Sequence, residues 1–115
     1  ASHKVIEKGD LITLDFACYY EGYVSDMTRT FAIGSIQSKL KEIYDIVLEA
    51  QLKVLAEAKP VLTGIQLDAI ARDHIASYGC GHAFGHTTGH GIGLEIHAGP
   101  NVSFRADKQF VPGNV

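Results

Sequence analysis

The chain has 115 residues, fewer than the roughly 150 typical of a domain, so it forms one domain or part of one. Its 46% hydrophobic and 20% charged residues exclude intrinsic disorder, and no apolar run approaches the ~18 residues of a membrane-spanning helix. A net charge of −3 without a basic stripe argues against nucleic-acid binding, and two cysteines without a secretory signal favour a cytoplasmic protein.

The first predicted element is a β-hairpin. Residues 11–20 and 23–31 are rich in β-branched, aromatic and apolar side chains, which is typical of strands. Glu21 and Gly22 between them form a turn signal, because glycine readily adopts a positive φ. The gap is too short for a crossover connection, so the two strands must be antiparallel.

Two helices are predicted after the hairpin. From residue 38 to 58 the apolar residues recur with the helical period, and charged residues occupy the opposite face. Thr63 and Gln66 match a capping box, which predicts a second helix over residues 65–78. Gly79 follows in the position of a helix C-terminal stop.

The remainder of the chain changes in character. Residues 79–93 hold six glycines and three histidines, with few large apolar groups. Residues 94–97 are predicted as a short strand and residues 99–101 as a turn. Two further short extended segments are predicted at residues 102–104 and 109–111. The whole pattern is α+β.

Two aspartates in the hairpin need an explanation, because aspartate is disfavoured in strands. With a two-residue loop, Asp15 pairs with Thr28 and Asp26 pairs with Ala17; with a four-residue loop, the two aspartates pair directly. Either loop puts both carboxylates on one face, since side chains alternate along a strand. Such a pair suits a hard divalent cation, and the alternative is a solvated sheet surface.

The histidines are the second unusual feature. His82, His86 and His90 are spaced by four, but the intervening glycines disfavour a helix and favour a loop or irregular strand. Four of the six histidines lie within sixteen residues, as expected for metal ligands, proton carriers or hydrogen-bond donors to a substrate. The alternative is a set of exposed loop histidines, a description that fits His3 and His74.

Other chemistries find little support. Residues 89–93 lack the third glycine and the βαβ unit of a dinucleotide site, and no serine nucleophile motif is present. Cys80 is predicted to be a small buried group. Cys18 lies on the hairpin face opposite the aspartates and is predicted to be in the core.

Both unusual segments resemble one family. Residues 15–17 with 24–31 resemble the aspartate hairpin of the pita-bread metallopeptidases, and residues 82–97 resemble their histidine segment. The sequence of residues 25–31 is closer to the Xaa-Pro dipeptidase, prolidase and Xaa-Pro aminopeptidase branch than to methionine aminopeptidases. The resemblance implies a partial pita-bread fold: an antiparallel hairpin sheet packed by two α-helices, with C-terminal strands missing. Residues 1–115 would then be an incomplete catalytic domain, lacking family segments at both ends.

The resemblance also implies roles for individual residues. Six positions are concerned: metal ligands at Asp15, Asp26 and His90, catalytic histidines at His86 and His97, and a supporting hydroxyl at Thr28. The complete enzyme would hold two divalent metal ions, Mn or Co, bridged by Asp26. Two glutamate ligands of the family are absent from these 115 residues, so at most one ion is expected here, weakly bound.

The function implied is hydrolysis of the bond before proline, in Xaa-Pro dipeptides or at the N-terminus of peptides. The substrate would be a peptide with proline at its second position, a homodimer is allowed, and this fragment alone is expected to be inactive. Alternatives are a methionine aminopeptidase, a non-enzymatic binding module or a metal-storing protein. Ala17 and Val61 stand where many family members have glycine, and Ala98 stands where an acidic residue is frequent.

Overall fold

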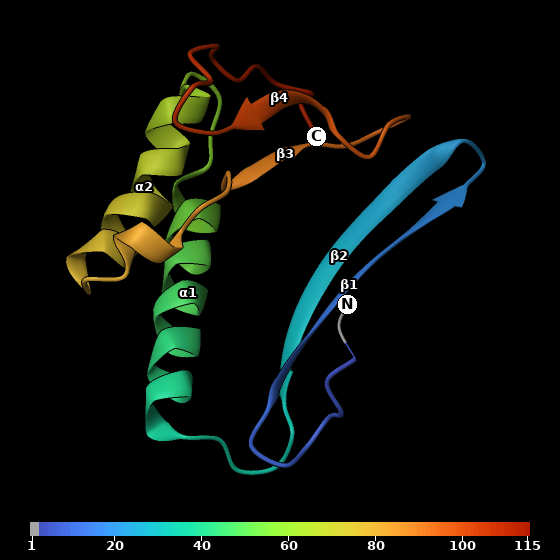
Figure 1. Ribbon diagram of the computed structural model, residues 1–115. Helices are drawn as coiled ribbons and strands as arrows, with labels where there is room; N and C mark the ends of the chain where they lie inside the picture. Colours follow the sequence, from blue (N-terminus) through green and yellow to red (C-terminus); the bar gives the residue numbers. More distant parts are fainter. Residues whose placement is uncertain (1–2) are drawn as a thin grey trace.

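A long hairpin, two packed helices and a second small sheet make up the fold (Figure 1). The computed structural model describes residues 3–115. The elements are β1 (Leu11–Tyr20), β2 (Tyr23–Ala32), α1 (Ser38–Glu57), α2 (Gly64–Ser77), the 3-10 helix η1 (Gly81–Ala83), β3 (Gly89–Gly91) and β4 (Ala98–Val102). This α+β content confirms the predicted fold class. Over residues 3–115, no helix has the length and apolar character needed to cross a membrane.

The hairpin turns through two residues. Glu21 and Gly22 have φ of 50° and 85°, as a tight turn between twisted antiparallel strands requires. Strands β1 and β2 consequently pair Asp15 with Thr28 and Ala17 with Asp26, which selects the shorter of the two predicted loops. The two carboxylates therefore share one face and lie diagonally across the strand pair rather than directly opposite.

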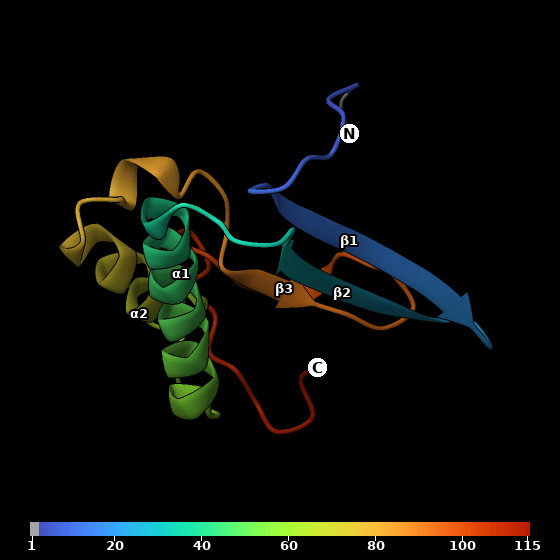
Figure 2. The same ribbon diagram turned by 90° about the horizontal axis from the view of Figure 1, so that it is seen from below.

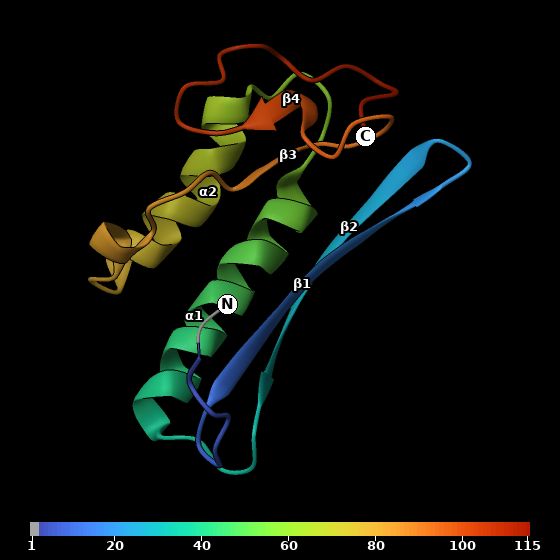
Figure 3. The same cartoon turned by 45° about the vertical axis from the view of Figure 1, so that its right-hand side comes forward.

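The two helices enclose the main hydrophobic core. Ile46 and Ala50 of α1 pack against Ala71 and Ile75 of α2, and the cluster is completed at its margin by Val54, Cys80 and Phe84. Cys80, predicted to be a small buried group, is only partly buried, because it lies at the margin of the core. In Figures 1 and 3 helix α2 runs back alongside α1, which follows from the short connection between them.

The second helix begins as the sequence predicts. The Thr63 hydroxyl accepts from the backbone N–H of Gln66, and the Gln66 side chain accepts from the backbone N–H of Thr63. This reciprocal pair satisfies two N–H groups that a helix start otherwise leaves unpaired. Gly79 ends the helix with a φ of 75°.

The second sheet differs from its prediction. The prediction of a strand at residues 94–97 is wrong, because these residues form the loop between β3 and β4. The predicted turn at residues 99–101 is also wrong, since β4 runs through them and pairs with β3. Strand β4 ends at Val102, and Gln109 makes an isolated bridge to Thr63. Glycine and proline are local turn signals, which pairing with a distant strand overrides here.

Strand β3 lies between the helices and the large hairpin (Figures 1 and 2). The backbone N–H of Val24 donates to the carbonyl of Gly93 at 2.9 Å, and Val24 is buried at this junction. Elsewhere the hairpin exposes most side chains of both faces, and Cys18 is exposed. The predicted core position of Cys18 is therefore wrong for this chain, because alternation assigns a face but not what covers it.

His74 is likewise not the exposed histidine that was predicted. It is 9% exposed in the α1–α2 interface, with its Nδ1 2.8 Å from the Nζ of Lys53. Its Nε2 lies 3.4 Å from a carboxylate oxygen of Glu49. The ring packs edge-on against Tyr78 with 5.2 Å between centroids. A histidine four residues after Ile70 continues a helix's apolar stripe, so it faces the partner helix.

Val61, between the helices, adopts a strained backbone conformation. Its φ is 76°, in the left-handed region that is a genuine outlier for a β-branched residue. Its N–H donates to the carbonyl of Phe110 at 3.0 Å, which holds the connection in this shape. The glycine expected here from the family resemblance would take the same conformation without strain.

We expect Val61→Gly to raise the free energy of unfolding by about 1 kcal/mol, because relief of the left-handed strain exceeds the entropy cost of a new glycine. Urea denaturation followed by circular dichroism measures the change. Val61→Ala keeps a Cβ and most of the strain, and Val111→Gly introduces a glycine where φ is not positive, so neither variant should stabilise the chain. Equal stabilisation by Val61→Ala would contradict the explanation.

Candidate metal-binding and catalytic site

An aspartate and a histidine meet where the large hairpin approaches the small sheet. The Nε2 of His90, on β3, lies 3.4 Å from a carboxylate oxygen of Asp26, on β2. The two side chains are 25% and 24% exposed, so both remain partly accessible to solvent. The Nδ1 of His90 donates to the carbonyl of Gly91 at 2.9 Å, because a carbonyl oxygen only accepts. Nε2 is therefore the nitrogen that faces the carboxylate and is available to a ligand.

Asp15 lies on the same hairpin face as Asp26 but on the other strand. One of its carboxylate oxygens accepts from the hydroxyl of Thr28 at 3.0 Å. Thr28, predicted as a supporting hydroxyl on the Asp26 strand face, thus orients Asp15. The cross-strand register explains this, since Thr28 is the residue directly opposite Asp15.

Of the three predicted metal ligands, His90 and Asp26 contact each other, and Asp15 does not complete a close group with them. Within residues 3–115, no three His, Cys, Asp or Glu side chains gather closely enough to hold a metal ion. His90 approaches the hairpin at Asp26, and Asp15 lies two residues along β1 from Ala17, the residue that pairs with Asp26. The donor types, two carboxylates and one imidazole on the same side, fit a divalent cation in their chemistry.

The two predicted catalytic histidines differ in their surroundings. The ring of His97 lies 4.6 Å from that of His90, centroid to centroid, so it adjoins the Asp26 pair. The ring of His86 packs edge-on against Phe84 at 5.0 Å, and its Nδ1 donates to the carbonyl of Thr87 at 2.8 Å. In both His86 and His90 the Nδ1 proton is committed to a backbone carbonyl, which leaves each Nε2 to receive a proton or a ligand.

Gly91 and Gly93, which follow His90, differ in whether a side chain would fit at their positions. A Cβ at Gly91 would lie 2.6 Å from the carbonyl oxygen of Gly99, closer than real Cβ atoms approach. A Cβ at Gly93 would meet nothing within 4 Å. Gly91 also borders a register shift in the β3–β4 ladder, where the two backbones come together. Gly91 is thus required for the strand contact that carries His90.

We expect Gly91→Ala to separate β3 from β4 and to displace the His90 imidazole, because backbone atoms of Gly99 cannot yield to a Cβ. The imidazole C–H signals of His90 in an NMR spectrum should shift, and the free energy of unfolding should fall by about 1–3 kcal/mol. Gly93→Ala is the matched control and should leave both quantities unchanged. Unaltered His90 signals in Gly91→Ala would refute this role of the glycine.

The sequence pattern did not predict an ion pair between Asp68 and Arg72 on α2. Asp68 is 1% exposed and receives hydrogen bonds from the Nε of Arg72 at 2.7 Å and its Nη2 at 3.2 Å. The backbone N–H and hydroxyl of Thr88 also donate to Asp68, at 3.1 and 2.7 Å. The available signal was an Asp and an Arg four residues apart, with Asp68 next to Leu67 in the apolar stripe of the helix.

The electrostatics of this pair are set by two opposing effects. Burial raises the pKa of Asp68, but the hydrogen bonds from Arg72 and Thr88 outweigh it, so the pKa lies below its ordinary value. The hydrogen bond to Asp68 in turn raises the pKa of Arg72. Both groups are therefore charged at neutral pH.

Acid should weaken the fold through Asp68. A carboxyl group with a lowered pKa in the folded state stabilises the fold above its unfolded pKa of about 3.9, and this stabilisation is lost as the pH falls through the folded pKa. We expect Asp68→Asn to lower the free energy of unfolding at pH 7 by about 3 kcal/mol and to flatten its decline below about pH 4. Urea titrations at several pH values measure both effects. The exposed Asp45→Asn, also in an i,i+4 pair, should change stability by less than about 1 kcal/mol.

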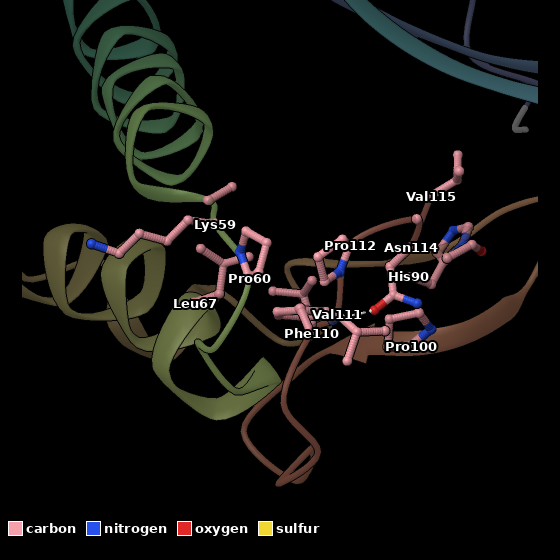
Figure 4. A pocket seen from close by; sticks show the side chains of 14 residues that line it. Lys59, Pro60, Leu67, His90, Pro100, Phe110, Val111, Pro112, Asn114 and Val115 are labelled. Carbon is pink, nitrogen blue, oxygen red and sulfur yellow. Dashed lines mark hydrogen bonds between the residues drawn. The ribbon is translucent and has the colours of Figure 1, made fainter.

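An apolar pocket adjoins the histidine segment. Its volume is about 370 Å³, and Figure 4 shows it between the α1–α2 connection and the end of the chain. Pro60, Leu67, Phe110 and Val111 contribute to its wall, and His90 lies at its margin. The side chains of Lys59 and Asn114 also line it. A mostly apolar wall with a few polar side chains is the usual composition of a small-molecule or peptide side-chain pocket.

Comparison with known proteins covers the whole chain. Residues 1–115 match the description of metallopeptidase family M24. An uncharacterized peptidase of Bacillus subtilis, YqhT, is 53% identical over 115 residues, which span all of this chain and 33% of that protein. An Xaa-Pro dipeptidase of Pyrococcus horikoshii is 54% identical over 103 residues, 90% of this chain and 29% of that protein.

A solved structure repeats the arrangement of the elements. The Xaa-Pro dipeptidase from Bacillus anthracis superposes with a TM-score of 0.95 at 57% identity, over 98% of this chain and 32% of that one. The 115 residues thus span about a third of the length of the proteins that they match.

Proposed function

Since the chain belongs to metallopeptidase family M24, we propose that it forms part of a metal-dependent peptidase that cleaves the bond before proline. The observation that carries this proposal is the approach of His90 to Asp26, 3.4 Å apart, on the hairpin face that also holds Asp15. The names of the relatives supply the substrate class, because the matched proteins of Pyrococcus horikoshii and Bacillus anthracis are Xaa-Pro dipeptidases.

The proposed metal ligands are Asp15, Asp26 and His90, for one ion in these 115 residues and for two, Mn or Co, in an enzyme with further ligands. A divalent ion held there supplies Lewis-acid activation of the scissile carbonyl and of the attacking water. Asp26 and His90 already face one another, and Thr28 holds the Asp15 carboxylate from the adjacent strand. A proline after the cleaved bond offers no N–H, so the substrate must be recognised by shape and by its carbonyl groups.

The proposed catalytic histidines act on the substrate side. With its Nδ1 committed to Thr87, His86 presents Nε2 to hold or transfer a proton. His97 lies against the ring of His90, where an N–H can donate to the oxygen that gains negative charge during hydrolysis. Both roles need only a donor or acceptor within hydrogen-bond distance of the reacting atoms.

Metal binding by the 115-residue chain tests the ligand assignment. We expect Co²⁺ to bind weakly, and Asp26→Asn and His90→Gln each to weaken binding at least about tenfold, as measured by calorimetry. Asp45→Asn removes an equal charge from an exposed position on α1 and should leave binding unchanged. With Mn²⁺ and an Ala-Pro dipeptide, these 115 residues alone should show no appreciable turnover. Equal Co²⁺ affinity in all variants would overturn the assignment.

A chimera tests the substrate class. Residues 1–115 replace the matching third of the Bacillus anthracis Xaa-Pro dipeptidase, which has the same fold over this segment. We expect the chimera to hydrolyse Ala-Pro and Leu-Pro and not Met-Ala, and Asp26→Asn within it to lower kcat/KM at least about 100-fold. A folded chimera that cleaves Met-Ala instead would favour a methionine aminopeptidase. A folded chimera that cleaves neither would favour a non-enzymatic binding module.

A further inference from the structure

The buried pair on α2 contacts every second residue of the segment that leads to His90. The Nη1 of Arg72 donates to the carbonyl of Phe84 at 3.0 Å, and its Nη2 donates to the carbonyl of His86 at 2.9 Å. Asp68 accepts from both the N–H and the hydroxyl of Thr88. One ion pair therefore fixes the backbone at positions 84, 86 and 88.

The other contacts of this segment are short-range backbone hydrogen bonds, from Phe84 and Gly85 to the carbonyls of Gly81 and Ala83, and the packing of Phe84 at the margin of the core. It lies between η1 and β3, has no regular secondary structure, and includes Gly85, whose backbone is intrinsically free. The Phe84 ring is stacked on the Arg72 guanidinium at 4.3 Å, and the Phe104 ring lies 5.2 Å away. The guanidinium is thus held in place between helix and aromatic rings, and its donors point at the segment.

The free-energy cost of burying the Asp68 carboxylate indicates that the Asp68–Arg72 pair has a specific role. Burying a carboxylate that is 1% exposed is expensive, and apolar residues of similar size often stabilise a core as well. If the pair only linked two turns of α2, the other N–H groups of Arg72 and the other acceptor sites of Asp68 would bond to water. Here two further N–H groups of Arg72, and two further hydrogen bonds to Asp68, go to residues 84–88. This segment carries His86 and ends two residues before His90.

We propose that Asp68 and Arg72 are positioning residues, which act through Phe84, His86 and Thr88 to fix the two histidines of the candidate site. His86 is fixed through its own carbonyl. His90 is fixed through Thr88, which anchors the start of β3 and so directs the imidazole to Asp26. The catalytic importance of this positioning rests on the proposed function, but the positioning itself can be measured in the chain without metal.

The Thr88 hydroxyl offers the sharpest test in the 115-residue chain. Thr88→Val keeps the shape of the side chain and removes the donor to Asp68, whereas Thr88→Ser keeps the donor. In Thr88→Val we expect the imidazole C–H signals of His86 and His90 to shift and the amide exchange rates at positions 86–90 to rise about tenfold, as for loss of a hydrogen bond to a charged group. Thr88→Ser should restore both, and Asp45→Asn should change neither.

The outcomes separate this inference from the proposed function. If Thr88→Val leaves the signals of both histidines unchanged, the positioning role is refuted, even where Co²⁺ binding remains sensitive to Asp26→Asn. If the histidine signals move but Co²⁺ binding never depends on Asp26, positioning stands and the proposed metal site fails. Should Thr88→Val not fold, Arg72→Lys, which keeps the charge but not the forked contacts, must shift the same signals.

In the chimera the same pair of variants gives a catalytic readout. Thr88→Val should lower kcat about tenfold or more with a smaller change in KM, since misplaced catalytic groups act mainly on the transition state. Thr88→Ser should retain most of the activity. Equal kcat in Thr88→Val and Thr88→Ser would also refute the positioning role.

Discussion

The hydrogen bonds of the buried Asp68 carboxylate are the interactions on which the arrangement of the candidate site depends. The carboxylate is the most deeply buried charged group among residues 3–115, and four hydrogen bonds from Arg72 and Thr88 keep it ionised. Through these bonds the rigid helix α2 controls a glycine-rich segment that has no regular structure of its own. The remaining contacts of the segment are short-range, such as the bond from the His86 Nδ1 to the carbonyl of Thr87, or begin only where Gly89 pairs with Val102.

The candidate site lies where two parts of the fold meet. The hairpin supplies the carboxylates, and the small β3–β4 sheet supplies the imidazoles of His90 and, from its loop, His97. The two parts meet at the Val24–Gly93 hydrogen bond and at the Asp26–His90 contact. Because the hairpin is otherwise largely exposed, the geometry of the Asp26–His90 contact is determined where Val24 bonds to Gly93.

Two positions would each suit glycine for a different reason, although only position 91 holds one. At position 61 the backbone is held in a left-handed conformation, so Val61 carries strain that glycine would not. At position 91 the conformation is ordinary, and glycine is needed because another backbone lies within 2.6 Å of a Cβ. The first requirement is local, and the second exists only because β4 returns beside β3.

Local patterns were sufficient for the hairpin, its turn, both helices and the capping box, because strand alternation, helical period and capping depend on neighbours within a few residues. They also placed Asp15 and Asp26 on one face and marked the histidine segment. Tertiary structure alone decided that β4 runs through the glycine-proline sequence, that His74 and Asp68 are buried, and that His90 reaches Asp26 while Asp15 stays apart. Each of these depends on which backbone or side chain lies opposite. Residue spacing marked His74 and Asp68 as lying on the apolar side of α2, but it could not show what would cover them.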